Sequence, residues 1–394
     1  MLTSGWIRCK ILYNISVREV FMRAFKSVIC ALLIVSVLFS FSGCFVNDFI
    51  DDVFGSMSMG NAPERMNETE IYEYFMDNIP RFKTDFVFEN ADEELVVQVY
   101  DSIIEAHPEF FWLGNGYESL TETKGAVSKV AFSPITLDEM DEVERGYADE
   151  FHRIAGDIVK EAKQLSSDYE RVLFVHDTII ESTDYDKEAA ALIGSSSSDN
   201  ILHREATAYG CLVEGEAVCS GYSSAFQHIM NKLCIECKRV SGTGMNGESH
   251  QWNIVKIDGE NYYIDVTWDD PVTDDGRDNL VYDYFLITTE ELLLTHEIDA
   301  DELVPLCTAD EYNYFVYNGL YVGEYSFRAV ERIIEDHSRE RSVSLKFESD
   351  DELMKAQNEL LGESRIFDID SVSSGAGSVY YLSGANGLVL TIYW

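Results

Sequence analysis

Basic residues are scarce in this sequence. The 394 residues include 29 Lys and Arg against 71 Asp and Glu, so the formal net charge at pH 7 is −42. A surface this negative repels nucleic acids and anionic phospholipid head groups, which argues against nucleic acid as a partner. Charge alone leaves cations and basic polymers as partners, and solubility in a salty or acidic exterior explains the same excess of acids.

A complete zinc-site motif is also missing. Cys234 and Cys237 have the spacing of half of such a motif, but no second Cys or His pair with zinc-site spacing follows them. Packing, or a disulfide at the end of a helix, is therefore favoured for these cysteines. For the Trp-Asp-Asp-Pro run at 268–271, a turn stabilised by its own aspartates is favoured over a cation site. We predict neither a metal nor a cofactor.

One long apolar run is present, from Val28 to Phe41, directly after the basic residues Arg23 and Lys26. A basic flank, a short apolar stretch and small residues at its exit are typical of a signal peptide rather than a spanning helix. Residues 1–44 hold five basic side chains and one acidic one, so their net charge is +4 and the rest of the chain carries −46.

The end of this run, Ser-Gly-Cys at 42–44, resembles a bacterial lipobox with Cys44 as the lipidated residue. Phe41 departs from that motif, which usually has a small residue there. We expect an extracytoplasmic protein anchored to the membrane through Cys44, with an uncleaved anchor or ordinary secretion as the alternatives. Residues 1–21 resemble sequence upstream of the true start, because Met22 is the better one.

The length predicts two or three domains, and 46% hydrophobic residues with 12% aromatic ones are enough for packed cores. The predicted order is a signal peptide with lipobox at 1–44, a tether at 45–70, an N-terminal α/β accessory region at 71–135, a central domain with a helical lead-in at 136–300, and a C-terminal α/β accessory domain at 301–394.

Apolar periodicity predicts the main elements. Helices are expected over 92–106, over 137–165 with a break near Gly146 or Gly156, and over 169–183, 327–337 and 350–361. Strands are expected over 110–113, 126–132 and 343–347, with an aromatic hairpin over 312–322 and two strands near the C-terminus. In the helix at 169–183, the adjacent pair His176 and Asp177 is read as a packing or capping histidine, because neighbouring helical residues do not share a face.

Cys219 lies where a run of small residues gives way to a helical apolar pattern, which places it at or just before a helix N-terminus. Amide N–H groups and the helix dipole favour an anion there and lower a cysteine pKa from ~8.5 towards ~3.5–7.5, so that the thiolate nucleophile forms. The backbone N–H of Cys219 is a candidate oxyanion donor. Cys211, eight residues earlier, is read as structural, with a role as the nucleophile itself as the alternative.

His250 stands at the entrance of an alternating, strand-like run, and Asp258-Gly259 marks a tight hairpin turn after it. The returning strand carries Asp265. Pairing across this turn brings the imidazole of His250 to the carboxylate of Asp265. A nucleophile, a base and a group that orients the base are what thiol-based acyl transfer requires.

Three runs carry a resemblance to a known family. Val-Cys-Ser-Gly-Tyr-Ser at 218–223, Ser-His-Gln-Trp-Asn at 249–253 and Tyr-Ile-Asp-Val-Thr-Trp-Asp-Asp-Pro at 263–271 resemble, in order, the motif blocks of the bacterial transglutaminase-like superfamily. The likeness covers about residues 165–290. Runs at 107–112 and 312–315 are more loosely similar to flanking regions of extracellular members.

The resemblance implies a papain-like α+β fold, with the helix that bears the cysteine packed on an antiparallel sheet, and a triad of Cys219, His250 and Asp265. It also implies a thioester on Cys219, formed from protein or cell-wall peptide amides and resolved by water or by an amine. Tyr209 resembles an aromatic position before the nucleophile and is a candidate oxyanion donor.

Two alternatives to an enzyme remain open: a non-catalytic binding or scaffold module at the cell surface, and a metal-binding protein that uses its acidic surface. The substrate and the oligomeric state do not follow from the sequence.

Overall fold

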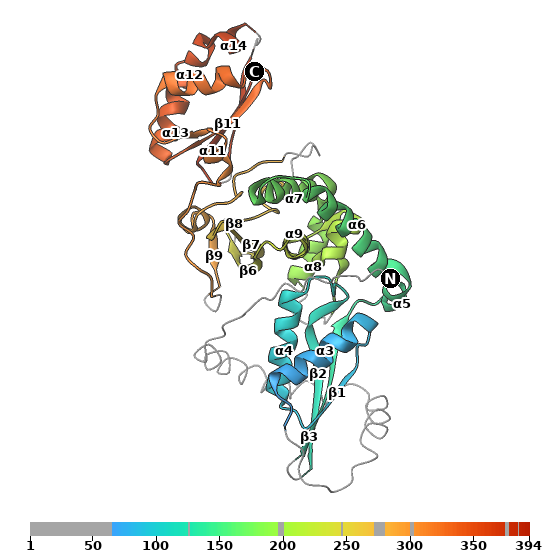
Figure 1. Ribbon diagram of the computed structural model, residues 1–394. Helices are drawn as coiled ribbons and strands as arrows, with labels where there is room; N and C mark the ends of the chain where they lie inside the picture. Colours follow the sequence, from blue (N-terminus) through green and yellow to red (C-terminus); the bar gives the residue numbers. More distant parts are fainter. Residues whose placement is uncertain are drawn as a thin grey trace. The chain divides into compact units, whose positions relative to one another are not determined.

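The structure is a computed structural model, and it describes residues 65–124, 127–195, 201–245, 247–271, 280–299, 303–374, 378–384 and 386–394. The predicted signal peptide, Cys44 and all but the end of the tether lie outside the described residues. By contacts the chain divides into residues 1–65 with 123–128, and residues 66–122 with 129–394. The second unit holds nearly all the elements described below (Figure 1). No helix among the described residues is long and apolar enough to cross a membrane.

The N-terminal region pairs two helices with a small sheet. Its elements are α3 (Glu68–Asn78), β1 (Phe86–Glu89), α4 (Glu93–Ala106), β2 (Leu113–Lys124) and β3 (Val127–Thr136), with strand order β1-β3-β2. Asn67 and Glu70 form a reciprocal capping box, so α3 replaces the last residues of the predicted tether. The strand predicted over 110–113 is wrong up to Trp112. Phe110 and Leu113 donate backbone hydrogen bonds to His107 and Phe110, which makes consecutive turns before β2 begins.

Helices surround the segment that carries Cys219. They are α5 (Met140–Glu142), a π-helical segment (Val143–Tyr147), α6 (Ala148–Ala162), α7 (Asp168–Ser182), α8 (Lys187–Ser195) and α9 (Cys219–Leu233), with the short strands β4 (Asp184–Tyr185) and β5 (Glu216–Ala217) between them. The break in the lead-in helix lies at the π segment around Gly146. Gly156 sits inside α6 with open space beside it.

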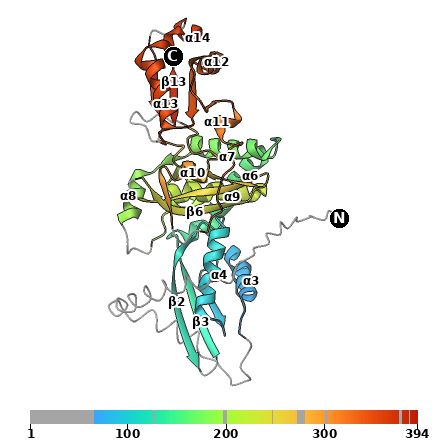
Figure 2. The same cartoon turned by 90° about the vertical axis from the view of Figure 1, so that its left-hand side faces the viewer.

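The central sheet is antiparallel, with strand order β8-β7-β6-β9. It consists of β6 (Cys237–Gly244), β7 (Ser249–Ile257), β8 (Glu260–Ile264) and β9 (His296–Ile298), and α10 (Thr289–Leu292) precedes the last strand. The predicted turn is present, with φ of 50° at Asp258 and 93° at Gly259. Helix α9 packs on β6 and β7 and contacts α6 and α7 as well, and Figure 2 shows it against the sheet. Ten consecutive residues of α9, Gly221–Met230, are therefore buried.

The C-terminal region is a second α/β unit with its own apolar core. Its elements are α11 (Tyr314–Tyr317), β10 (Tyr321–Val322), α12 (Phe327–Asp336), β11 (Ser342–Phe347), α13 (Asp350–Ala356), α14 (Asp370–Ser373), β12 (Tyr380–Ser383) and β13 (Val389–Tyr393), with strand order β10-β11-β13-β12. The predicted hairpin over 312–322 is wrong. Asn313 caps a helical turn through the backbone N–H of Phe315, and β10 pairs in parallel with β11.

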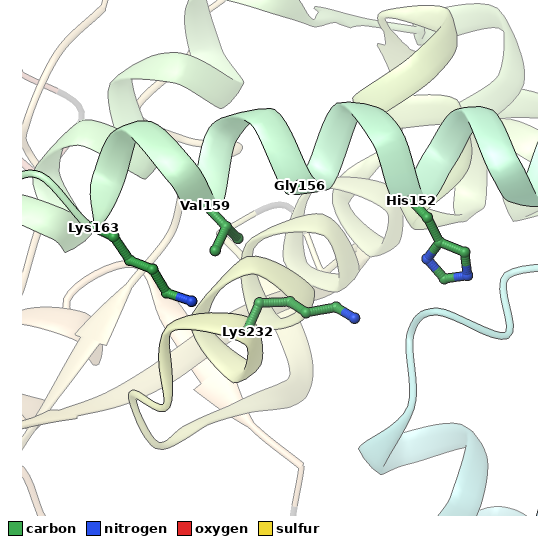
Figure 3. A pocket seen from close by; sticks show the side chains of 5 residues that line it. All are labelled: His152, Gly156, Val159, Lys163 and Lys232. Atoms are coloured by element: carbon green, nitrogen blue, oxygen red, sulfur yellow. The ribbon is translucent and has the colours of Figure 1, made fainter. Parts of the chain in front are cut away.

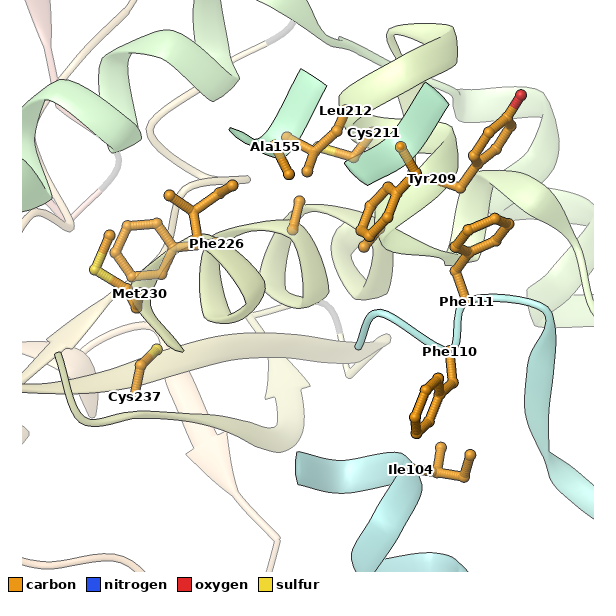
Figure 4. Packing of buried hydrophobic residues seen from close by; sticks show 14 of the residues in the cluster. Ile104, Phe110, Phe111, Ala155, Tyr209, Cys211, Leu212, Phe226, Met230 and Cys237 are labelled. Carbon is orange, nitrogen blue, oxygen red and sulfur yellow. The ribbon is translucent and has the colours of Figure 1, made fainter. Parts of the chain in front are cut away.

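A continuous apolar core joins the N-terminal region to α9. Figure 4 shows Ile104, Phe110 and Phe111 beneath the helices, near Tyr209 and the buried face of α9. Polar contacts reinforce this packing, because Arg239 of β6 donates a 2.8 Å hydrogen bond to the carbonyl of Ile104. The predicted α+β class is confirmed: helices and an antiparallel sheet form separate layers in the region of Cys219.

Candidate active site

Cys219 is the first residue of α9, a helix whose N-terminus has no other anion. The N-cap residue is Val218, which supplies no side-chain cap, and the first turn contains no acidic residue. Gly221 and Tyr222 donate back to the carbonyl of Val218 at 2.8 and 3.1 Å. An α-helix leaves its first N–H groups without an intrahelical acceptor, so a thiolate on Cys219 takes the place that a capping carboxylate holds elsewhere.

Close backbone packing fixes this helix start. Val218 donates a 2.8 Å hydrogen bond to the carbonyl of Glu205. A Cβ on Gly221 would lie 2.5 Å from that same carbonyl oxygen, so only glycine lets the segment at 204–206 approach α9. β4 pairs in parallel with β5 just before the cysteine. These contacts hold Cys219 rigidly relative to the helices.

His250 lies in β7, and its neighbours connect that strand to α9. Ser223 Oγ of α9 donates to Gln251 Oε1 at 2.8 Å, and Asn253 Nδ2 donates to the carbonyl of Ser223 at 3.0 Å. Because side chains alternate along a strand, Gln251 and Asn253 take the helix-facing side while His250 and Trp252 take the other. The two hydrogen bonds set the register of His250 along the helix that starts with Cys219.

Asp265 directly follows β8, and its buried carboxylate accepts four hydrogen bonds. Oδ1 accepts from the backbone N–H groups of Thr267 and Trp268 at 3.0 and 3.1 Å. Oδ2 lies 2.6 Å from Nε2 of His250 and 3.1 Å from Nε2 of His296. A carboxylate held in this way stays ionised although it is buried, and its pKa is lowered because the two histidines outweigh desolvation.

The structure brings the three predicted site residues together. With Nε2 of His250 on Asp265, Nδ1 is the ring nitrogen left for Cys219, whose sulfur is near enough to act on the pKa of His250. Desolvation lowers the pKa of His250, but Asp265 first and Cys219 second overcome it and raise this pKa to about 10. An imidazolium between a carboxylate and a sulfur stabilises the thiolate.

His296 of β9 is part of this cluster, and sequence analysis missed it. Its Nδ1 lies 2.8 Å from Thr295 Oγ1, while its Nε2 contacts Asp265. Its ring centroid is 4.3 Å from that of Trp268 and 4.9 Å from that of Trp252. The sequence offered no motif for it, because β9 is three residues long and follows irregular chain.

Residues 154–266 match the model of the transglutaminase-like superfamily. The chain contains a transglutaminase-like domain. The matched range includes Cys219, His250 and Asp265, and it ends before His296. No curated protein matches the sequence.

Three solved structures are similar to part of this chain, all at low identity. The first is a crystal structure of a TGase, with 18% identity, a TM-score of 0.28 and coverage of 38% of this chain and 44% of that one. A candidate cysteine protease from Cytophaga hutchinsonii has 12% identity, a TM-score of 0.24 and coverage of 39% and 61%. A candidate protease from Parabacteroides distasonis has 9% identity, a TM-score of 0.22 and coverage of 38% and 36%. The matched region spans less than two thirds of each of these chains.

Tyr209 lies in the aromatic packing of the transglutaminase-like domain. Its ring stacks on Phe111 at 4.8 Å and on Tyr147 at 5.0 Å between centroids. Figure 4 shows it above Phe111 in this cluster. The contacts that position Tyr209 are therefore those of the core between the N-terminal region and α6, and Tyr209 is not needed to build the site around Cys219.

A different tyrosine borders the site. Tyr185 of β4 pairs with Ala217, two residues before Cys219, and its ring centroid is 6.4 Å from that of Tyr222, one helical turn after Cys219. Burial, then negative charge at Cys219, Glu248 and Asp265, raises the pKa of its phenol to about 12. Within the described residues, no group is hydrogen-bonded to its hydroxyl. The sequence placed Tyr185 in no motif, and the β4–β5 pairing brings it here.

A second buried His–Asp pair is formed by His176 of α7 and Asp269, which lies in the loop after β8, as Asp265 does. His176 contacts Asp177 Oδ1 through Nδ1 at 2.9 Å and Asp269 Oδ2 through Nε2 at 3.1 Å. The side chains of His176 and Asp177 do meet, contrary to the prediction for adjacent residues, but both ring nitrogens face carboxylates. The aspartates of the Trp-Asp-Asp-Pro run also bond beyond their own turn: Asp269 accepts from the N–H of Tyr284 at 2.8 Å, and Asp270 accepts from the hydroxyl of Tyr222 at 2.6 Å.

The remaining thiols of the described body differ from Cys219. Cys211, Cys237 and Cys307 are buried and free of disulfides, so the pairing considered for Cys237 does not form. Burial raises the pKa of Cys211 to about 12 and that of Cys307 to about 11. Protonated, buried thiols are poor nucleophiles. Cys234 is exposed but lies at the C-cap of α9, at the other end of the helix from Cys219, which leaves Cys219 as the cysteine placed for chemistry.

A pocket of about 340 Å³ lies away from this cluster. It is lined by His152, Gly156, Val159, Lys163 and Lys232, between α6 and the C-terminal end of α9 (Figure 3). Cys219 stands at the opposite end of the 15-residue helix, roughly 20 Å away at 1.5 Å per residue. The pocket therefore takes no part in the chemistry at Cys219.

The donor atoms of His250, Asp265 and His296 lie within 4.8 Å of one another, which is close enough for a metal ion. Hydrogen bonds already account for the arrangement, because Asp265 Oδ2 accepts from both imidazoles and Thr295 faces the remaining nitrogen of His296. The three side chains therefore need no ion to stay together.

Proposed function

We propose that this protein is an extracytoplasmic, lipid-anchored thiol enzyme that forms a Cys219 thioester with protein or cell-wall peptide amides. The observation that supports this best is the 2.6 Å contact between His250 and Asp265, with Cys219, the first residue of a 15-residue helix, also acting to raise the pKa of His250. The transglutaminase-like domain match at 154–266 agrees with it.

In the first step the Cys219 thiolate attacks the amide carbonyl carbon, and the carbonyl oxygen becomes an oxyanion. As the C–N bond breaks, His250 gives its proton to the departing amine, which leaves the acyl group on Cys219 as a thioester. Asp265 keeps the imidazole oriented and stays ionised throughout. No metal or organic cofactor enters these steps.

The oxyanion needs donors close to the nucleophile. The backbone N–H of Cys219 is one, because it lies at the helix start. For the second we propose the Tyr185 hydroxyl, in place of Tyr209. It flanks Cys219 and, among the described residues, is hydrogen-bonded to nothing else. Its raised pKa keeps it a donor at neutral pH.

In the second step neutral His250 accepts a proton from water or from a primary amine, which attacks the thioester. Water gives a carboxylic acid, as in a peptidase or amidase, and an amine gives a new amide, as in a transamidase. Both routes regenerate the thiol. The strongly acidic chain, with a net charge of −42, favours basic substrates and amine-bearing acceptors by electrostatic attraction.

Alkylation by iodoacetamide tests the nucleophile without a known substrate. We expect Cys219 to react about 10- to 100-fold faster than an ordinary thiol at pH 6, because an imidazolium and a helix start stabilise a thiolate. Cys234, which is exposed, provides an internal control in the same sample. His250→Ala is expected to bring Cys219 down to the rate of Cys234. Equal rates in the unmodified protein would contradict the proposal.

The acceptor and the location need separate tests. Incubation with cell-wall fragments, proteins and a labelled primary amine distinguishes the routes: incorporation indicates transamidation, and new termini or ammonia without label indicate hydrolysis. Labelled fatty acid should enter the full-length protein and not a Cys44→Ala variant. A Cys219→Ala protein that keeps every partner and phenotype would instead favour a non-catalytic scaffold.

A further inference from the structure

We infer that His296 is a positioning residue of this site, which holds the Asp265 carboxylate in the orientation that receives His250. The inference rests on the proposed function, since it assigns a role in the same chemistry. It extends the Cys–His–Asp arrangement to a fourth side chain that lies 31 residues beyond the aspartate and outside the matched range 154–266.

The hydrogen-bond donors can be assigned around His296. The ionised carboxylate of Asp265 only accepts, so Nε2 of His296 carries a proton and donates to Oδ2 at 3.1 Å. Thr295 Oγ1, 2.8 Å from Nδ1, then serves as the donor to that nitrogen. A neutral imidazole satisfies both contacts. The hydroxyl of Thr295 is thus compatible with the tautomer that points a proton at Asp265.

This contact completes the set of donors around the carboxylate. Two backbone N–H groups hold Oδ1, and two imidazoles hold Oδ2. Without His296, Oδ2 would have His250 as its single protein donor and would be the less constrained oxygen. A second donor on the same oxygen also draws off some of its negative charge, which moderates how tightly Asp265 holds the proton of His250.

The surrounding structure encloses His296 closely. Trp268, Trp252 and Tyr284 have ring centroids at 4.3, 4.9 and 5.4 Å from the imidazole, and His296 is 2% exposed. Rings packed on three sides leave the imidazole little freedom to turn away from Asp265.

Two glycines of β6 permit this enclosure. Gly244 is paired with His296 and Gly242 with Ile298. A Cβ on Gly242 would lie 2.0 Å from the carbonyl oxygen of Glu297, and one on Gly244 would lie 2.8 Å from the Trp268 ring. β9 can therefore approach β6 because Gly242 lacks a side chain, and Trp268 can lie against β6 because Gly244 lacks one. The strand that carries His296 and the tryptophan that covers it depend on the same feature.

The test compares His296→Phe, His296→Gln and the unmodified protein. Phenylalanine fills the ring volume without a donor, whereas the glutamine amide restores an N–H near the position of Nε2. The readout is the pH profile of Cys219 alkylation, together with kcat and KM for release of p-nitrophenolate from p-nitrophenyl acetate, an activated ester that acylates reactive thiols. Ile298→Ala, in the same strand but without a polar contact to Asp265, controls for general damage to β9.

We expect His296→Phe to lower kcat about 10- to 100-fold with KM nearly unchanged, the range for loss of one hydrogen bond to a charged group. In the pH profile of Cys219 alkylation, the fall in rate on the alkaline side reports loss of the His250 proton. In His296→Phe this fall should move to higher pH, because Asp265 then holds the proton of His250 more tightly. The other titratable group that acts on His250, Cys219 on α9, is the same in all variants. His296→Gln should restore most of the rate and the original pH of this fall, and Ile298→Ala should leave that pH unchanged.

The outcomes separate the two ideas. If Cys219 of the unmodified protein is alkylated no faster than Cys234, the proposed function fails and His296 has no reaction to support. If Cys219 is fast but the Phe and Gln variants share one profile, or match Ile298→Ala, the role of His296 is overturned while the thiol chemistry stands. Melting temperatures recorded for each variant exclude unfolded samples from the comparison.

Discussion

Two buried histidine–aspartate pairs have their aspartates on the loop after β8, and the two histidines have different second partners. Asp265 and Asp269 lie four residues apart, and each contacts Nε2 of a histidine, His250 at 2.6 Å and His176 at 3.1 Å. The difference lies in the second ring nitrogen. In His250 it is left for Cys219, whereas in His176 it meets the carboxylate of Asp177.

The pKa values of the two aspartates are shifted in opposite directions. The pKa of Asp265 is lowered, because two imidazoles and two backbone N–H groups outweigh its burial. The pKa of Asp269 is raised to about 7, because burial outweighs the effect of His176, and Asp283 adds a like charge. A His–Asp contact alone therefore does not identify a catalytic pair. The catalytic pair is identified by the partner of the second ring nitrogen, which is a cysteine for His250 and a carboxylate for His176.

Replacement of the two aspartates by asparagine should separate the pairs most strongly. Asp265→Asn leaves His250 without its anionic partner and in the wrong tautomer, so we expect the esterase rate to fall by about 10⁴-fold, as in a serine triad that loses its aspartate. Asp269→Asn should leave that rate nearly unchanged, because Asp269 contacts His176 and the N–H of Tyr284 rather than His250. Similar losses in both variants would mean that the loop acts as one unit.

Two tyrosines that approach this loop extend the comparison. The hydroxyl of Tyr222 lies 2.6 Å from Asp270 Oδ2 and 3.0 Å from the carbonyl of Thr183, and its single proton is shared between these two acceptors. Tyr222→Phe should therefore lower the unfolding free energy by roughly 1–3 kcal/mol. Tyr185→Phe removes a hydroxyl that bonds no described group, and stability should hardly change. If that hydroxyl stabilises the oxyanion, kcat should fall about 10²–10³-fold. An unchanged kcat in Tyr185→Phe would remove Tyr185 from the mechanism.

The same comparison explains what the sequence could predict. Cys219, His250 and Asp265 were predictable because each lies at the border of a regular element: a helix start, a strand entrance and the return of a tight hairpin. Local patterns fix such borders, and one turn at Asp258-Gly259 fixes the register between the last two.

Tyr185, His296 and the partner of His176 could not be predicted in this way. Each reaches its place through a non-local contact: a two-residue parallel pairing, a three-residue edge strand, and a hydrogen bond between residues 93 positions apart. Hydrophobic periodicity does not encode such contacts. The aromatic run at 312–322 failed for a related reason, because the cap at Asn313 overrides the strand preference of its tyrosines.

The two pairs should also differ in how their contribution to stability responds to pH. Asp269 and His176 both have raised pKa values: burial raises that of Asp269, and Asp177 with Asp269 raises that of His176 against burial. The folded state therefore binds protons that the unfolded state has released above pKa values of about 3.9 and 6.5. Stability from this cluster is full at low pH and is lost as pH rises through the folded values.

Asp265 has the opposite sign, and its stability is lost only as pH falls below its unfolded value of about 3.9. The unfolding free energy of the unmodified protein should thus fall between pH 4.5 and 7.5, and that of Asp269→Asn should fall less. The difference should be on the order of a few kcal/mol for a pKa displaced to about 7. Urea unfolding at several pH values measures this. Parallel curves for Asp269→Asn and the unmodified protein would show that Asp269 titrates normally, and the contrast between the two pairs would then rest on Cys219 alone.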